Sequence, residues 1–249
     1  RFENIILPVT QMSQKCQGVY LLPSRSKVIE LIEGRDVYPD LYDGVNLRYI
    51  DIYKFYKKMN QPNLVEGLRA NKKGLQYIDQ WILEEKVSEP IVTITIRQYD
   101  FDKARNSKIS EWIRFANHIK DLGYYPVIIP DTDKSFNTDE IFEELFVFNE
   151  CAWNMGLRMA LYESSFVNFF GPHGPLDLAL WNKKCSYIAM NFLPEGSTIS
   201  TKEAHQKIGL KIGDNYKFSL PDQKLIYLPD TYKNILDAFN SFVQENQYN

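Results

Sequence analysis

The length, composition and charge of the chain describe an ordinary folded protein and exclude several classes. Its 249 residues are 44% hydrophobic and 24% charged, which suits one large domain or two small ones. With 29 basic and 32 acidic residues the net charge is -3, so we expect no nucleic-acid partner. No apolar run is long enough for a transmembrane segment. The 3 widely spaced cysteines indicate neither a disulfide framework nor a metal site, and we expect a cytoplasmic protein.

The amino-terminal part predicts a smaller α/β domain over residues 1–88. Short apolar runs at residues 4–9 and 18–22 alternate with turn signals, and helical spacing follows at residues 26–33. A longer helical stripe over residues 64–87 ends before Pro90. We place the domain boundary there, so that residues 89–249 form the second domain.

From residue 91 onward, buried strands alternate with amphipathic helices. The apolar, β-branched run at residues 91–96 is typical of a buried parallel strand, and a Gly-terminated helix follows it. The repeated β-α-β pattern predicts an α/β fold with a Rossmann-like parallel sheet. Further strands are predicted at residues 125–129, 166–170, 185–192 and 224–228, and further helices at 137–146, opened by a capping box, at 152–163 and at 232–243.

Polar and glycine residues follow the predicted strands at the points where ligands of such sheets bind. Arg97, Asp131 and Gly171 each come directly after a strand. Because parallel strands end at one edge of the sheet, we expect all three on one rim.

The loop after the first buried strand carries two arginines, Arg97 and Arg105. A guanidinium group is a planar fork of donors that stays charged and suits the oxygens of a diphosphate. The alternative is that both arginines pair with nearby Asp side chains and organise the loop.

A glycine- and proline-rich turn joins the strand at residues 166–170 to a short helix. Glycine allows close approach of a ligand, but the same turn is also good without one. Asp131, Thr132 and Glu163 are candidates for ribose or base contacts, with capping or surface solvation as the alternative. The turn residues predicted to bind the ligand are Gly171, Pro172, His173, Gly174 and Pro175, and no pair of histidines has metal-ligand spacing.

Three segments of the second half resemble glycosyltransferases of the GT-B fold, particularly the fucosyltransferase-like branch that uses GDP-sugars. They are residues 94–97, 126–132 and 159–175. That branch has His-x-Arg at the first strand, whereas this chain has Thr95-Ile-Arg97, so the resemblance covers only the arginine.

The resemblance implies transfer of a sugar from a nucleotide diphosphate sugar to a hydroxyl of a glycan or another acceptor. The donor is a substrate, and neither a metal nor another cofactor is implied. Arg97 and Arg105 would offset the charge of the departing diphosphate, and residues 1–88 would form a reduced acceptor-side domain. A non-catalytic relative that binds a nucleotide or glycan, and a nucleotide-sugar epimerase, are the alternatives.

Overall fold

A single parallel sheet forms the centre of the computed structural model, which describes residues 2–37, 42, 52–62, 67–136, 142 and 144–246. The sheet has 6 strands in the order β3-β2-β1-β4-β5-β6, and every neighbouring pair is parallel. The α/β fold and the Rossmann-like parallel sheet predicted from the sequence are therefore confirmed. The strands are β1 (Ile91–Thr95), β2 (Tyr125–Ile129), β3 (Phe146–Val147), β4 (Val167–Phe170), β5 (Tyr187–Ala189) and β6 (Gln223–Leu225).

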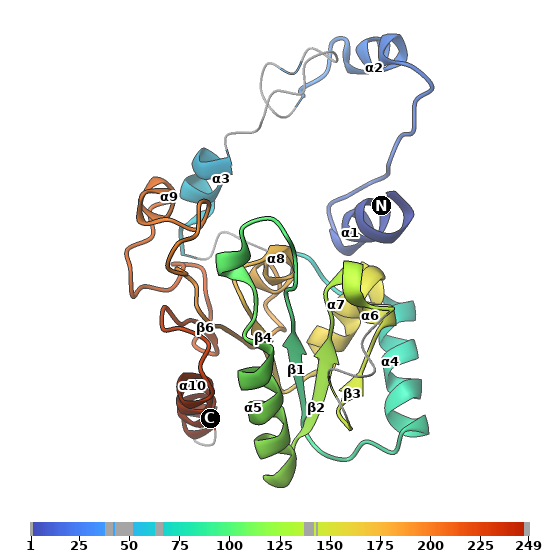
Figure 1. The fold of residues 1–249 in the computed structure, drawn as a ribbon. Helices are drawn as coiled ribbons and strands as arrows, with labels where there is room; N and C mark the ends of the chain where they lie inside the picture. Colours follow the sequence, from blue (N-terminus) through green and yellow to red (C-terminus); the bar gives the residue numbers. More distant parts are fainter. Residues whose placement is uncertain are drawn as a thin grey trace.

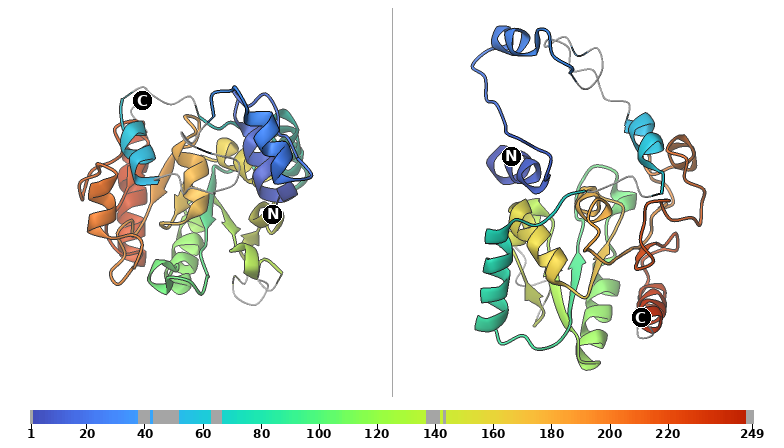
Figure 2. Two further views of the ribbon diagram at one scale, coloured as in Figure 1. Left: turned by 90° about the horizontal axis from the view of Figure 1, so that it is seen from above. Right: turned by 180° about the vertical axis from the view of Figure 1, so that it is seen from behind.

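Helices cover both faces of the sheet (Figures 1 and 2). Alternate side chains of β2 point to opposite faces: Val127 and Ile129 pack in one buried cluster and Ile128 in the other. The first cluster includes side chains of α4 (Lys72–Glu84), α7 (Met155–Ser164) and α8 (Gly174–Leu180), and the second those of α5 (Ile109–Asp121) and α10 (Tyr232–Asn246). None of the helices in the described part of the chain is long and apolar enough to cross a membrane.

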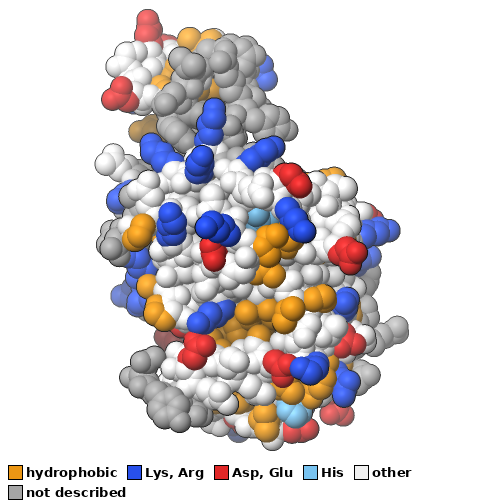
Figure 3. All heavy atoms as spheres, turned by 90° about the vertical axis from the view of Figure 1, so that its left-hand side faces the viewer, with side chains coloured by type: hydrophobic (Ala, Val, Ile, Leu, Met, Phe, Trp, Pro, Cys, Tyr) orange, Lys and Arg blue, Asp and Glu red, His pale blue; other side chains and the backbone are white. Residues whose placement is uncertain are grey.

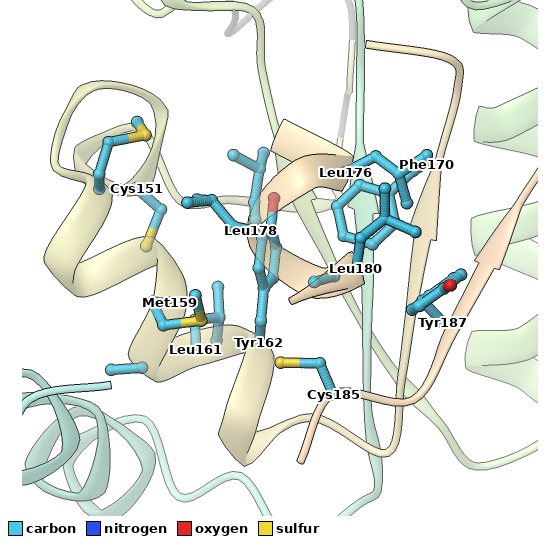
Figure 4. Packing of buried hydrophobic residues seen from close by; sticks show 14 of the residues in the cluster. Cys151, Met159, Leu161, Tyr162, Phe170, Leu176, Leu178, Leu180, Cys185 and Tyr187 are labelled. Atoms are coloured by element: carbon cyan, nitrogen blue, oxygen red, sulfur yellow. The ribbon is translucent and has the colours of Figure 1, made fainter. Parts of the chain in front are cut away.

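The first of these clusters packs closely around the buried Tyr162 (Figure 4). Its hydroxyl lies 2.9 Å from the hydroxyl of Thr95, which is also buried. Thr93, on the same strand, donates to Asn168 at 2.5 Å. Each buried hydroxyl therefore has a partner, which removes the cost of burying it in β1.

The described residues of the amino-terminal part are mainly helical, and the α/β domain predicted over residues 1–88 stays a prediction. The elements of this part are a π-helix (Phe2–Ile6), α1 (Leu7–Met12), α2 (Arg25–Ile32) and α3 (Ile52–Met59). Within residues 2–37, 52–62 and 67–88 the only extended pairing is an isolated antiparallel bridge between Ser13 and Leu68. The run at 4–9 becomes helical, with Pro8 in the first turn, where its missing N–H costs nothing. The run at 18–22 forms no strand with any of the described residues and lies exposed.

Helix α4 lies next to the sheet domain although it precedes residue 88. It packs against α7, and its Trp81 contributes to the cluster that covers β2. The domain boundary near residue 88 stays a prediction, and this packing shows that α4 belongs to the helical layer of the second half.

Two predicted helices of the second half are different in the structure. Phe146 and Val147 form β3, the edge strand beside β2, because Phe146 packs against Trp81 and Phe148. The proposed capping box at residues 137–140 lies outside the described residues. The helix predicted at 152–163 is divided into α6 (Glu150–Trp153) and α7, since Asn154 caps α7 by accepting from the Leu157 N–H at 3.0 Å.

Candidate functional site

The loops that follow β1, β2 and β4 meet around one pocket at the carboxyl edge of the sheet. The pocket has a volume of about 610 Å³, and we call it the arginine pocket. The π-helix also contributes, through Ile5 and Ile6, because the amino-terminal helices lie beyond this edge (Figure 1). Its polar lining includes Arg97, Arg105, Asp131, Thr132, Arg158 and His173, with Gly174 and Pro175 beside them.

Arg97 is buried and organises the loop that follows β1. Its Nη1 donates to the Asp102 carbonyl at 3.2 Å and to Asn106 Oδ1, and its Nη2 donates to the Phe101 carbonyl. The guanidinium carbon lies 5.7 Å from the ring centroid of Tyr99. Arg97 therefore organises the loop, which was the alternative to ligand binding given from the sequence. Its acceptors are neutral carbonyl and amide oxygens and not the Asp carboxylates expected there.

Arg105 connects this loop to the glycine- and proline-rich turn. Its Nε donates to the Pro172 carbonyl at 2.7 Å, and its Nη2 donates to the same oxygen. Burial lowers the pKa of Arg105, and the positive charge of Arg97 lowers it further, against the opposing effect of Asp102 and Asp177. Arginine remains a cation despite this shift, so two positive charges are held close together.

A third arginine, Arg158, lines the same pocket and was not singled out from the sequence. It belongs to α7 and is 2% exposed. Its Nε and Nη2 donate to the carbonyls of Cys151 and Ala152 at 2.5 and 2.6 Å. The sequence carries a signal for it, because Arg158 is the one charged residue in residues 155–162, a run otherwise made of apolar residues, glycine and tyrosine.

These three guanidinium groups carry unneutralised charge in the part of the chain that the structure describes. None of them lies within ion-pair distance of a carboxylate there. A guanidinium has five N–H donors, and no hydrogen bond joins Nη1 of Arg105 or Arg158 to another described residue. Cations held in a partly desolvated pocket favour an anionic ligand, because water screens them poorly.

Asp131 and Thr132 line the pocket and also stabilise the turn after β2. The Asp131 carboxylate accepts from the backbone N–H groups of Gln98 at 3.0 Å and Asp133 at 3.4 Å. The Thr132 hydroxyl donates to the Ala152 carbonyl at 2.8 Å. Asp131 and Thr132 therefore make the capping contacts that were the alternative to ribose or base contacts. Both residues nevertheless line the arginine pocket.

The turn from Gly171 to Pro175 leads from β4 into α8, and His173 is the residue before the helix. A side chain at Gly171 would place its Cβ 3.3 Å from His173 Cδ2, which is tighter than ordinary contact. Glycine at this position therefore leaves room for the imidazole. The His173 N–H donates to the Gly171 carbonyl at 2.9 Å and closes the turn.

The imidazole of His173 is buried at the pocket wall and uncharged. It is 9% exposed, and its Nε2 has no hydrogen-bond partner among the described residues. Burial lowers the pKa of His173 to about 3, and Arg158, Arg105 and Arg97 act in the same direction. The Nε2 atom can therefore form a hydrogen bond with a ligand, but the neutral imidazole adds no positive charge to the pocket.

The neutral state of His173 predicts a pH dependence of stability. An unfolded histidine binds a proton below its ordinary pKa of 6.5, whereas the native one does not until about 3. The free energy of unfolding should therefore fall as the pH decreases through this window. His173→Asn should flatten that part of the curve in urea titrations at several pH values. An unchanged slope in the variant would contradict a buried neutral imidazole.

Glu163 does not join the pocket, contrary to the contact with a ribose predicted for it. It lies in the last turn of α7, ahead of β4, and its side chain is 3% exposed. Its Oε1 accepts from Arg69 Nε at 3.0 Å and from the Ala70 N–H and Asn182 Nδ2, both at 2.7 Å. The carboxylate is thus occupied in tying residues 69–70 to the sheet domain, which does not support the predicted ligand role.

A second pocket, of about 240 Å³, adjoins the first and is mainly apolar and aromatic. We call it the aromatic pocket. Arg105, His173 and Gly174 line both pockets, so the two are continuous at the turn before α8. The sequence did not reveal it because its walls come from distant segments. They include Tyr56, Leu176, Leu180, Phe192, Ile208 and Tyr216.

The outer surface around α3, α9 (Lys202–Lys207) and α10 carries a mixture of side chains. Figure 3 shows Lys and Arg gathered mainly on the upper half of this face, with few Asp and Glu among them, and a more even mixture of charged and hydrophobic groups below.

Comparisons with known proteins give weak structural similarities. No family model and no curated protein matches the chain. A glycosyl transferase of family 9 from Veillonella parvula has 12% identity and a TM-score of 0.48, over 72% of this chain and 54% of that one. ADP-heptose lps heptosyltransferase II of E. coli has 14% identity and a TM-score of 0.49, over 75% of this chain and 56% of its own. The chain thus spans little more than half the length of either protein.

Proposed function

We propose that the chain is a GT-B-like glycosyltransferase that binds a nucleoside diphosphate sugar at the carboxyl edge of its sheet and transfers the sugar to an acceptor hydroxyl. The observation that carries the proposal is the convergence of Arg97, Arg105 and Arg158 on one pocket, without a carboxylate ion-pair partner among the described residues. Such a site suits a ligand with two linked phosphoryl groups.

The proposed chemistry follows from where negative charge develops. When the sugar leaves, the diphosphate oxygen gains charge, and fixed guanidinium groups stabilise it without having to reorganise. Arg105 is the best placed, because it is only half-buried and its Nη1 is unbonded to the described residues. The volume of about 610 Å³ is within the range of small-molecule sites. This proposal assigns charge compensation to the arginines and not to a metal ion.

The acceptor would enter the arginine pocket on the side that faces the amino-terminal helices. Ile5 and Ile6 of the π-helix already line the arginine pocket on the side away from the strands. For the donor we propose a GDP-sugar, in keeping with the sequence resemblance.

A non-catalytic nucleotide- or glycan-binding protein is the second candidate. It is favoured by the engagement of Asp131, whose carboxylate already accepts two backbone N–H groups and is poorly placed to act as a base. Binding without turnover across donors and acceptors would select this function. Turnover of a nucleotide sugar without an acceptor, to an epimeric product, would instead select an epimerase.

Nucleotides should stabilise the protein against heat. A ligand present at 100 times its dissociation constant adds ~2.7 kcal/mol to the free energy of unfolding. We expect this in thermal-shift measurements with GDP, and a smaller effect with UDP, ADP and CMP. The absence of a shift with any of the four would contradict the proposed function.

A further inference from the structure

The aromatic pocket is left unused by the proposed diphosphate contacts. It holds about 240 Å³ beside the arginine pocket, and its walls are mostly rings and aliphatic side chains. A pocket of this composition favours a flat apolar group over a charged one, because burying unpaired charge there is costly.

The rings of this pocket come from three separate segments and are held in fixed orientations. Tyr216 is stacked on Phe218, with ring centroids 4.9 Å apart and an interplanar angle of 12°. The ring centroid of Tyr56, in α3, lies 6.0 Å from that of Tyr216. The ring centroid of Phe192, which follows β5, lies 6.3 Å from that of Tyr216. Rings that pack on one another in this way provide stiff walls for stacking.

The aromatic pocket is continuous with the arginine pocket, so a single ligand could occupy both. Both pockets are lined by Arg105, His173 and Gly174, so a bound ligand can extend from one pocket into the other. Its charged part would lie with the three arginines. Its planar part would lie among the aromatic rings.

Asp177 gives the aromatic pocket one polar wall of known chemistry. Its Oδ1 accepts a hydrogen bond of 2.6 Å from the Tyr56 hydroxyl, and its Oδ2 has no hydrogen-bond partner among the described residues. A carboxylate only accepts, and its charge repels phosphate. The orientation of a nucleotide is thereby fixed, with the diphosphate away from Asp177.

We propose that the aromatic pocket holds the nucleobase of the ligand, and that Asp177 favours guanine; this inference rests on the proposed function. Guanine presents two adjacent N–H donors, N1–H and the 2-amino group. The N3–H of uracil lies between two carbonyl acceptors, and the 6-amino group of adenine lies beside an acceptor nitrogen. A carboxylate oxygen can therefore accept hydrogen bonds from the two donors of guanine. In uracil and adenine, an acceptor atom next to the donor would repel the carboxylate.

The test compares two ligands on two variants of α9, measured by isothermal titration calorimetry. Ala204 lines the aromatic pocket, whereas Gln206 is exposed on the same helix and lines neither pocket. Ala204→Trp should fill the pocket and weaken GDP binding about tenfold or more, the scale of one base-stacking contact. It should leave the affinity for inorganic pyrophosphate unchanged. Gln206→Trp should change neither affinity.

Two further variants keep the test decisive. Ile199→Ala, at a pocket residue that is 43% exposed, should also weaken GDP selectively and puts little strain on folding. Asp177→Asn should reduce the preference for GDP over UDP. Unchanged GDP affinity in both pocket variants would place the base elsewhere and overturn this inference while leaving the diphosphate site intact. Failure of the unaltered protein to bind either GDP or pyrophosphate would overturn the proposed function with it.

Discussion

Arg105→Met should weaken the binding of a nucleoside diphosphate about tenfold to a hundredfold. A hydrogen bond to a charged group contributes roughly 1.5–3 kcal/mol, and Arg105 combines a half-buried charge with an Nη1 that binds none of the described residues, at the junction of the two pockets. The loss of its bonds to the Pro172 carbonyl should lower the free energy of unfolding by roughly 1.5–3 kcal/mol. Titration calorimetry with GDP and urea unfolding would measure the two effects separately.

Two matched variants show whether the effect belongs to the site. Arg105→Lys keeps the positive charge but not the planar fork, so its affinity should lie between those of the unaltered protein and Arg105→Met. Arg114 makes a cation–ring contact, with its guanidinium carbon 4.0 Å from the Tyr232 ring centroid, and it lines neither pocket. Arg114→Met should leave binding unchanged. Full affinity in Arg105→Met, accompanied by a large loss of stability, would make Arg105 a purely structural residue.

The sheet and the position of the rim could be predicted because they depend on local patterns and on one rule of topology. Residues 91–95 and 125–129 are runs of mainly apolar and β-branched residues, and both form strands within one residue of the predicted bounds. Since parallel strands end at one edge, the residues after them had to lie near one another. Arg97 and Asp131 do line one pocket, whereas Gly171, the third residue predicted at this rim, is not among its lining residues and only its neighbours from His173 to Pro175 are.

What could not be predicted depends on contacts between distant segments. Phe146 is apolar in a window that also fits a helix, and only its packing against Trp81 makes it part of an edge strand. The aromatic pocket combines α3 with segments beyond β5, and no spacing in the sequence connects them. Glu163 was predicted at the ligand edge although it precedes its strand, and that position belongs to the opposite edge.

Glu163→Ala should cost roughly 3 kcal/mol of stability, because removing one member of a buried pair leaves its partners unsatisfied. The Arg69 guanidinium, the Ala70 N–H and the Asn182 amide would all lose their common acceptor. Urea unfolding would measure the loss. Nucleotide affinity should not change, since Glu163 lines neither pocket. Glu195→Ala removes an exposed carboxylate and should change neither quantity.

The pH dependence of this loss distinguishes a charged Glu163 from a merely polar one. Burial alone would raise the pKa of Glu163, but hydrogen bonds from Ala70, Asn182 and Arg69, with the charge of Arg69, outweigh it and hold the pKa below its ordinary value of 4.5. Its contribution to stability is therefore complete above pH 4.5 and is lost as the pH falls through the lowered native pKa. Glu163→Gln, which keeps the shape without the charge, should flatten that acid limb of the stability curve. The same acid limb in both proteins would mean that Glu163 is protonated in the native state and that its link to Arg69 is not an ion pair.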